Sequence, residues 1–108
     1  MKTKIIELKD YIEDRKIISG RKNGIEIREK LKIEDLENNN DIIEIIIPDD
    51  ILSFNSSYFL GMLGKSVRKY KSKEAFLKKY TFKCNDIVKM NIDDGILDAL
   101  NNNNALED

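Results

Sequence analysis

Residues 42–47, IIEIII, place five isoleucines around a single glutamate, Glu44. Side chains that branch at Cβ are stiff and pack well on the pleated surface of a sheet, so this run is typical of a strand. Because Glu44 alone interrupts the apolar run, we expect a central strand buried on both faces. Pro48 should end the strand, since proline has no N–H to donate to a neighbouring strand.

Further strands and helices are predicted on both sides of this run. Alternating apolar residues predict strands at 3–8 and 80–84, and after the first of these a polar stretch leads to a second apolar pair, Ile17 and Ile18. Helical spacing predicts a helix that begins at residue 21 and ends before Glu37, then helices at 56–70 and 74–79, and a last helix capped by Asn85 or Asp86. This order predicts an α/β fold, a small mixed sheet covered by helices, with one face or edge available to a partner.

The length and composition favour one domain in the cytoplasm. The chain has 108 residues, which we expect to form a single domain over 1–100 and a polar, frayed tail over 101–108. The first residues carry no apolar run of a signal peptide, and no stretch approaches the ~20 apolar residues of a membrane span. We therefore expect a soluble cytoplasmic protein that does not bind membranes.

No residue pattern in the chain indicates catalysis. The sequence contains no histidine, so it lacks the imidazole on which Ser-His-Asp and Cys-His nucleophiles depend. Its single cysteine, Cys84, can form no intramolecular disulfide and has no other zinc-type ligand beside it. No glycine-rich phosphate loop or paired carboxylate motif stands out. We expect a protein that is not an enzyme and uses no cofactor or metal.

A motif after the central strand points to a known family. The segment ILSFNSSYFLGMLG, residues 51–64, resembles the switch segment of STAS domains, the fold of bacterial anti-sigma-factor antagonists. Over residues 3–100 the chain is more similar to the bacterial STAS-like domains of unknown function called DUF4325. The residues that carry this likeness are Gly20, Arg21, Gly24, Arg28, residues 42–47, Ser56, Ser57, Tyr58, Phe59, Gly64, Phe76, Tyr80, Phe82, Asn85 and the apolar residues of 92–100.

The resemblance implies a regulatory module that binds a protein, with an anti-sigma-type ATPase or kinase as its partner. It makes Ser56 a candidate for phosphorylation and Ser57 its neighbour or substitute, at the start of the helix after the central strand. Candidate docking residues on the edge formed by 55–63 are Asn55, Tyr58, Phe59 and Met62. The simpler alternative is that Ser56 caps the helix while Phe59 fills the core.

Two groups of cations could contact an anion or a partner. Arg21 and Arg28 flank Gly24 near a helix start, and residues 65–83 form a basic run that includes Lys65, Arg68 and Lys69. Such a run favours a second kind of function, a mobile-element or phage-type inhibitor or a nucleic-acid-associated factor. The net charge of −1, from 19 basic and 20 acidic residues, favours an acidic protein surface over nucleic acid. A solvated helix face is the plain alternative for both groups.

Overall fold

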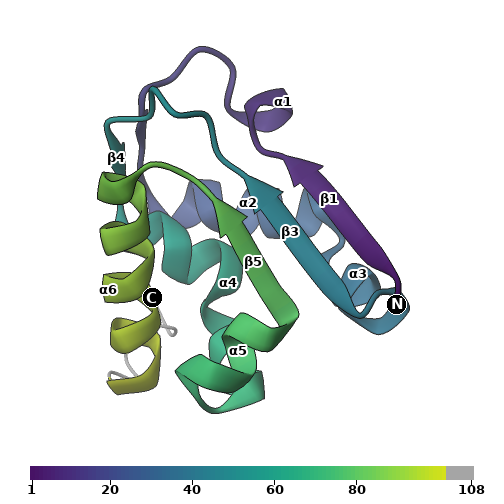
Figure 1. Ribbon diagram of the computed structural model, residues 1–108. Coiled ribbons are helices and arrows are strands. Elements are labelled where there is room, and N and C mark those ends of the chain that lie inside the picture. The colour runs from purple at the N-terminus through teal and green to yellow at the C-terminus, as the bar shows by residue number, and fades with distance from the viewer. Residues whose placement is uncertain (102–108) are drawn as a thin grey trace.

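The computed structural model describes residues 1–101 and confirms the α/β class (Figure 1). Its main sheet has three strands in the order β1 (Thr3–Glu7), β3 (Ile42–Ile46) and β5 (Tyr80–Lys83). Both strand pairings are parallel. The sheet is therefore purely parallel, whereas a mixed sheet was expected. The IIEIII run does provide the central strand, because β3 pairs with both of its neighbours.

The expectation that β3 is buried on both faces is wrong. Ile43, Ile45 and Ile47 are buried in the core, whereas Ile42, Glu44 and Ile46 on the other face are only half-buried. Within residues 1–101 the helices lie on one side of the sheet, and the side turned towards the viewer in Figure 1 carries none.

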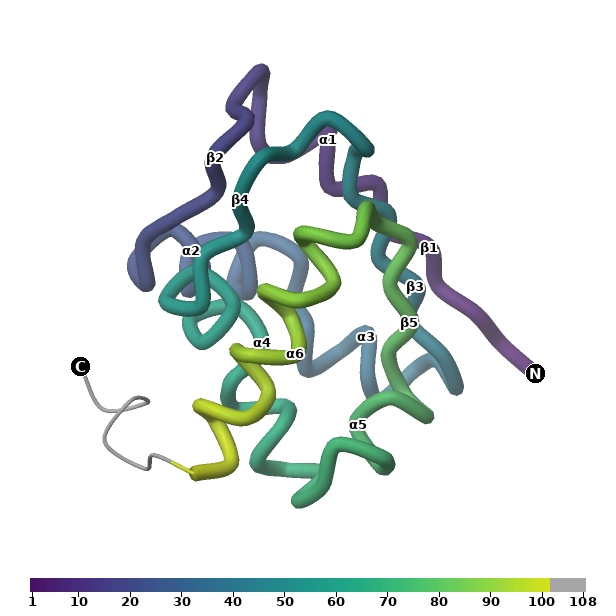
Figure 2. The backbone as a smooth tube through the Cα atoms, turned by 60° about the vertical axis from the view of Figure 1, so that its left-hand side comes forward, coloured from purple at the N-terminus to yellow at the C-terminus, as the bar shows by residue number. Residues whose placement is uncertain are grey.

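A second, smaller sheet pairs β2 (Ile17–Ile18) with β4 (Ser53–Phe54) in parallel. In Figure 2 these two strands lie together at the end of the molecule from which α4 starts. None of β2, β4 and the four-residue helix α1 (Lys9–Ile12) was predicted as an element, because segments of two to four residues are too short to show a period. The sequence marked Ile17 and Ile18 only as an apolar pair.

The helices follow the predicted segments closely. They are α2 (Arg21–Leu31), α3 (Ile33–Asn39), α4 (Ser56–Tyr70), α5 (Lys73–Lys79) and α6 (Asp86–Asn101). Helix α2 ends at Leu31, before Glu37 as expected, because Lys32 adopts a left-handed conformation with a φ of 53° and turns the chain. The separate helix α3, which contains Glu37, was not predicted.

Helix α4 is the centre of the packing, with α2 on one side and α6 on the other (Figure 1). Gly24 of α2 and Gly61 of α4 bring the backbones of those two helices together. On the α6 side, Phe59 packs onto Gly95. Of the predicted tail, the structure describes Asn101 alone, as the last residue of α6; the remainder lies outside the described residues.

Candidate functional site

Asn55 caps helix α4 directly before the two serines. Its side-chain Oδ1 accepts hydrogen bonds from the Ser57 backbone N–H at 2.7 Å and from the Ser57 hydroxyl at 2.6 Å. Ser56 and Ser57 are the first two residues of the helix, and both are half-buried. The capping function considered for Ser56 therefore belongs to Asn55, and the Ser57 hydroxyl is already engaged in that cap.

The predicted docking edge is mostly in the core. Tyr58, Phe59 and Met62 are each at most 2% exposed, so these three cannot contact a partner, and the prediction for them is wrong. The physical reason is that α4 is covered by helices on two sides, which leaves few of its residues at the surface. Burial also raises the pKa of Tyr58 to about 12, as expected for a phenol away from water. Asn55 is the member of the predicted set that is exposed.

Exposed apolar side chains lie instead on or beside β2, β4 and the start of α6. Ile17 is 59% exposed, Leu52 63%, Ile87 55% and Met90 66%, and we call these four residues the apolar patch. Ile17 pairs with Ser53 in the small sheet, next to Leu52, while Leu52 and Ile87 line one shallow hollow. Met90 follows Ile87 by three positions on α6, so the two side chains lie on one side of the helix.

Hydrogen bonds fix the elements that carry the apolar patch. Asn91 of α6 accepts a hydrogen bond from the Phe54 N–H through Oδ1 at 2.8 Å, which ties α6 to β4. Asn85 donates to the carbonyl oxygens of Asp49 at 2.9 Å and Ile51 at 2.8 Å, and its Oδ1 caps α6 by accepting from the Val88 N–H. The patch is thus built on a fixed frame, with Asp49, Asp50 and Asp86 around the hollow.

Three of the five predicted cations meet in one place. Arg21 and Arg28 of α2 and Lys65 of α4 line a hollow between these helices. Arg68 and Lys69 do not line it. Arg28 is buried, so the alternative that it lies on a solvated helix face is wrong for this residue. Lys65, Arg68 and Lys69 are exposed.

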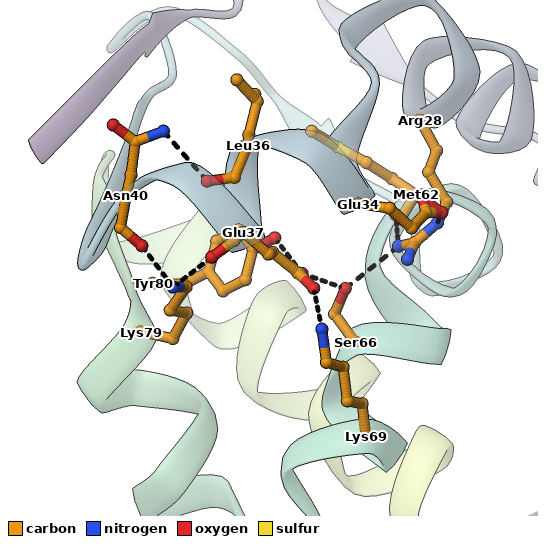
Figure 3. A network of polar contacts seen from close by, with 10 residues as sticks. All are labelled: Arg28, Glu34, Leu36, Glu37, Asn40, Met62, Ser66, Lys69, Lys79 and Tyr80. Atoms are coloured by element: carbon orange, nitrogen blue, oxygen red, sulfur yellow. Dashed lines mark hydrogen bonds and ion pairs between the residues drawn. The ribbon is translucent and has the colours of Figure 1, made fainter.

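A buried carboxylate, Glu37, organises a second polar cluster (Figure 3). Its side chain is 1% exposed. Oε2 accepts hydrogen bonds from the Ser66 and Tyr80 hydroxyls, and Oε1 accepts one from Lys69 Nζ at 3.0 Å. Arg28 Nη1 in turn donates to Ser66 Oγ at 3.1 Å, so the cluster joins α2, α3, α4 and β5.

Burial by itself would raise the pKa of Glu37, but hydrogen bonds from Ser66, Tyr80 and Lys69 outweigh it and hold the pKa below its usual value. The carboxylate is therefore ionised, and its partners satisfy it. Lys79 adds to the cluster by donating to the Glu37 and Asn40 carbonyl oxygens at the end of α3. Because its oxygens are engaged and shielded from water, this cluster stabilises the fold and offers no open reaction site.

The structure also locates the possible metal ligands and the single thiol. Within residues 1–101 no group of three or more His, Cys, Asp or Glu side chains is placed to hold a metal ion. Cys84 is half-buried, and burial raises the pKa of its thiol, so the reactive thiolate is disfavoured. No helix in this part of the chain has the length and apolar character needed to cross a membrane.

The basic run is partly used inside the molecule. Lys69 pairs with Glu37, Lys73 with Asp93 and Lys83 with Glu44, and Lys79 holds the end of α3. Cations already engaged in this way contribute less to a nucleic-acid surface. Binding of nucleic acid through this run stays a prediction.

Glu37 and the apolar patch were missed by sequence reasoning. The sequence of α6 does carry a signal for the patch, because its apolar residues occur on more than one side of the helix. Val88, Ile92 and Ile96 form one buried stripe, so Ile87 and Met90 must point elsewhere. No comparable signal marks Glu37, since its donors come from distant segments.

Comparisons with known proteins add no relative, because no family model, no curated protein and no solved structure matches this chain. The resemblance to STAS-like domains therefore stays a prediction.

Proposed function

We propose that the chain is a non-catalytic regulatory module that binds another protein, and that the partner docks on the apolar patch. The observation that carries this proposal is the exposure of Ile17, Leu52, Ile87 and Met90 on adjoining elements held by side-chain hydrogen bonds. Apolar side chains grouped at a surface mark interaction sites more often than scattered ones do. Covering them releases about 25 cal/mol for each Å² removed from water.

The charges around the patch favour a protein over nucleic acid as the partner. Asp49, Asp50 and Asp86 line the hollow that Leu52 and Ile87 share. Asp50 is paired with Lys16, while Asp49 and Asp86 have no ion pair within residues 1–101. These carboxylates would repel a phosphate backbone, and likewise an anionic membrane. We therefore propose a protein that presents apolar anchor residues, in keeping with an anti-sigma-type ATPase or kinase.

Phosphorylation of Ser56 is the proposed means of regulation. Ser56 begins α4 directly after β4 and Asn55, and its hydroxyl makes no hydrogen bond within residues 1–101. A phosphate there would gain hydrogen bonds from backbone N–H groups of the first turn, so the modified chain can stay folded. It would also add nearly two negative charges, and a partner with an apolar surface could dock only by removing water from those charges, which costs free energy. We expect phosphorylation to weaken binding.

Affinity capture from lysate of the source cell tests the docking surface. The full chain, the double variant Leu52→Asp/Ile87→Asp and the matched control Leu97→Asp are compared after nuclease treatment, with captured proteins identified by mass spectrometry. Leu97 is an exposed leucine further along α6, outside the patch. We expect the same protein with wild type and Leu97→Asp, and at least a tenfold loss with the double variant. Capture that the double variant leaves unchanged would overturn the proposal.

A second arm tests the switch separately. Ser56→Glu should reduce capture, whereas Ser56→Ala, which removes the hydroxyl without adding charge, should retain it. Retention by both serine variants, together with loss by Leu52→Asp/Ile87→Asp, would reject phosphorylation as the control and keep the docking surface. Adding ATP to the lysate shows whether the native serine responds in the same direction.

A further inference from the structure

The hollow between α2 and α4 is lined by charged residues that take no part in the proposed docking surface. Three cations, Arg21, Arg28 and Lys65, line it together with two acids, Glu29 and Glu34. The hollow is separate from the apolar patch, since the two share no lining residue. Its volume of about 200 Å³ is below the ~300 Å³ at which sites for drug-sized molecules begin, so it suits a small charged group.

Arg28, which lines this hollow, is held by hydrogen bonds to α4 (Figure 3). Its side chain is only 9% exposed. Nη1 donates to the Met62 carbonyl oxygen at 2.8 Å and to Ser66 Oγ at 3.1 Å, two buried contacts that fix the plane of the guanidinium. Such a preset planar group loses little freedom when it binds an oxyanion.

The opposite edge of the same guanidinium is incompletely used. Nε donates to Glu34 Oε1 at 3.0 Å, but Nη2, which lies on the same edge as Nε–H, has no hydrogen bond within residues 1–101. None of the buried side-chain nitrogen or oxygen atoms in that range is left without a partner, so Nη2 must be reached by solvent. An oxyanion could accept hydrogen bonds from Nε and Nη2 through two of its oxygens at once. Glu34 accepts only the one from Nε.

Glu34 occupies the position that an external anion would take. Its side chain is 63% exposed, so its ion pair with Arg28 is screened by water and weak. Moving Glu34 away leaves Arg28 and Lys65 to face an incoming anion, with Glu29 as the remaining acid of the lining. Two cations match a phosphate dianion better than they match a single carboxylate. Lys65 is exposed at the margin and makes no ion pair within residues 1–101, so it can turn towards the bound group.

We propose that this hollow binds a dianionic phosphate group, which displaces Glu34 from Arg28 and accepts hydrogen bonds from Nε and Nη2 of that guanidinium and from Nζ of Lys65. The group is held by its phosphoryl oxygens, and the remainder of the molecule stays outside. Binding involves no covalent step. Two sources share this chemistry, free inorganic phosphate and a phosphorylated serine, and they are distinguished by the test.

The test is a ¹H–¹⁵N NMR titration of the full chain with inorganic phosphate at pH 7.5 and constant ionic strength, with chloride as the reference anion. We expect saturable shifts of the Arg28 Nε–H signal and of amides near residues 28 and 65. Glu34→Gln should tighten binding about three- to fivefold, because a weak competing ion pair is removed. Lys65→Ala should weaken binding by a similar factor. Both variants change exposed side chains, so the fold is retained.

Matched controls separate the site from overall charge. Glu74→Gln changes the net charge exactly as much as Glu34→Gln but lies on α5, and Arg68→Ala removes an exposed cation of α4 outside the hollow. Both should leave the affinity unchanged. Shifts that never saturate, or equal effects of each variant and its control, would overturn the proposal. Titration with O-phosphoserine identifies the source: tighter binding than inorganic phosphate supports a phosphorylated serine, and weaker binding supports free phosphate.

Discussion

Gly24 and Gly61 lie at the crossing of α2 and α4, each against the backbone of the other helix. A Cβ on Gly61 would come within 2.2 Å of the Arg21 carbonyl oxygen, and a Cβ on Gly24 within 2.2 Å of the Tyr58 carbonyl oxygen. Real Cβ atoms essentially never come so close to another heavy atom, and here the neighbour is a backbone that cannot turn aside. The close approach of α2 and α4 therefore depends on two residues without side chains.

Gly61→Ala should destabilise the chain although alanine favours a helix. Separating the two helices costs about 1–3 kcal/mol, as overpacked cores do, and the gain in helix propensity of about 1 kcal/mol offsets only part of it. Urea unfolding followed by circular dichroism measures the change. Lys22→Ala, an exposed substitution on α2, serves as the control and should leave the midpoint nearly unchanged. A Gly61→Ala midpoint equal to that of wild type would contradict the close crossing.

Asn55→Ala should cost about 1 kcal/mol of unfolding free energy, within the range of 0.5–2 kcal/mol known for helix caps. Ser56→Ala should cost far less, because Asn55 Oδ1 and not the Ser56 hydroxyl accepts from the first turn of α4. Thermal unfolding of the two variants side by side provides the comparison. A larger loss for Ser56→Ala would assign the cap to the serine.

Glu37 should make the stability of the chain depend on acid. Its pKa is lower in the folded state than in the unfolded state, so the unfolded chain binds more protons as the pH falls. The stabilisation is complete well above the unfolded pKa of about 4.3 and is lost as the pH falls through the lower, folded value. Wild type should therefore lose stability below about pH 4.3, and Glu37→Gln should lose less.

Urea unfolding at a series of pH values measures this difference. At pH 7 Glu37→Gln should be less stable by about 1–3 kcal/mol, because donors arranged for a carboxylate then face an amide. The gap between the two proteins should narrow as the pH falls. A gap that stays constant from pH 7 to pH 3 would show that Glu37 does not carry the acid dependence, and Asp50→Asn, at an exposed ion pair, is a suitable control.

The sequence was sufficient for the elements with a clear period. The IIEIII run predicted β3, and the apolar spacing of residues 56–70 predicted α4 with its observed bounds. The face of each residue was less predictable, because Tyr58, Phe59 and Met62 are buried by two helices that come from distant parts of the chain. The break at Lys32 was missed for a different reason, since lysine is an unusual residue in a left-handed conformation.

For the candidate sites, the sequence likewise predicted some of the residues but not the contacts between them. Arg21 and Arg28 were selected because they flank Gly24 near a helix start and Lys65 because it belongs to a basic run, and the structure brings the three to one hollow. Nothing in the sequence places Glu34 on Arg28 or Tyr80 on Glu37, because those contacts arise only when α3 packs between α2 and the main sheet. The apolar patch likewise combines Ile17, Leu52, Ile87 and Met90 from segments far apart in the sequence, and the hollow shared by Leu52 and Ile87 forms only through tertiary packing.

The most direct measurement of the central claim is site-specific photocrosslinking in living source cells. A benzophenone side chain is introduced singly at position 87 or 52 in the apolar patch and, as controls, at position 97 on α6 and position 5 on the main sheet, all exposed apolar positions. Docking on the apolar patch predicts one crosslinked protein shared by positions 87 and 52 and absent from positions 97 and 5. Crosslinks confined to position 5 or 97, with none at 52 and 87, would contradict it and place the binding surface elsewhere.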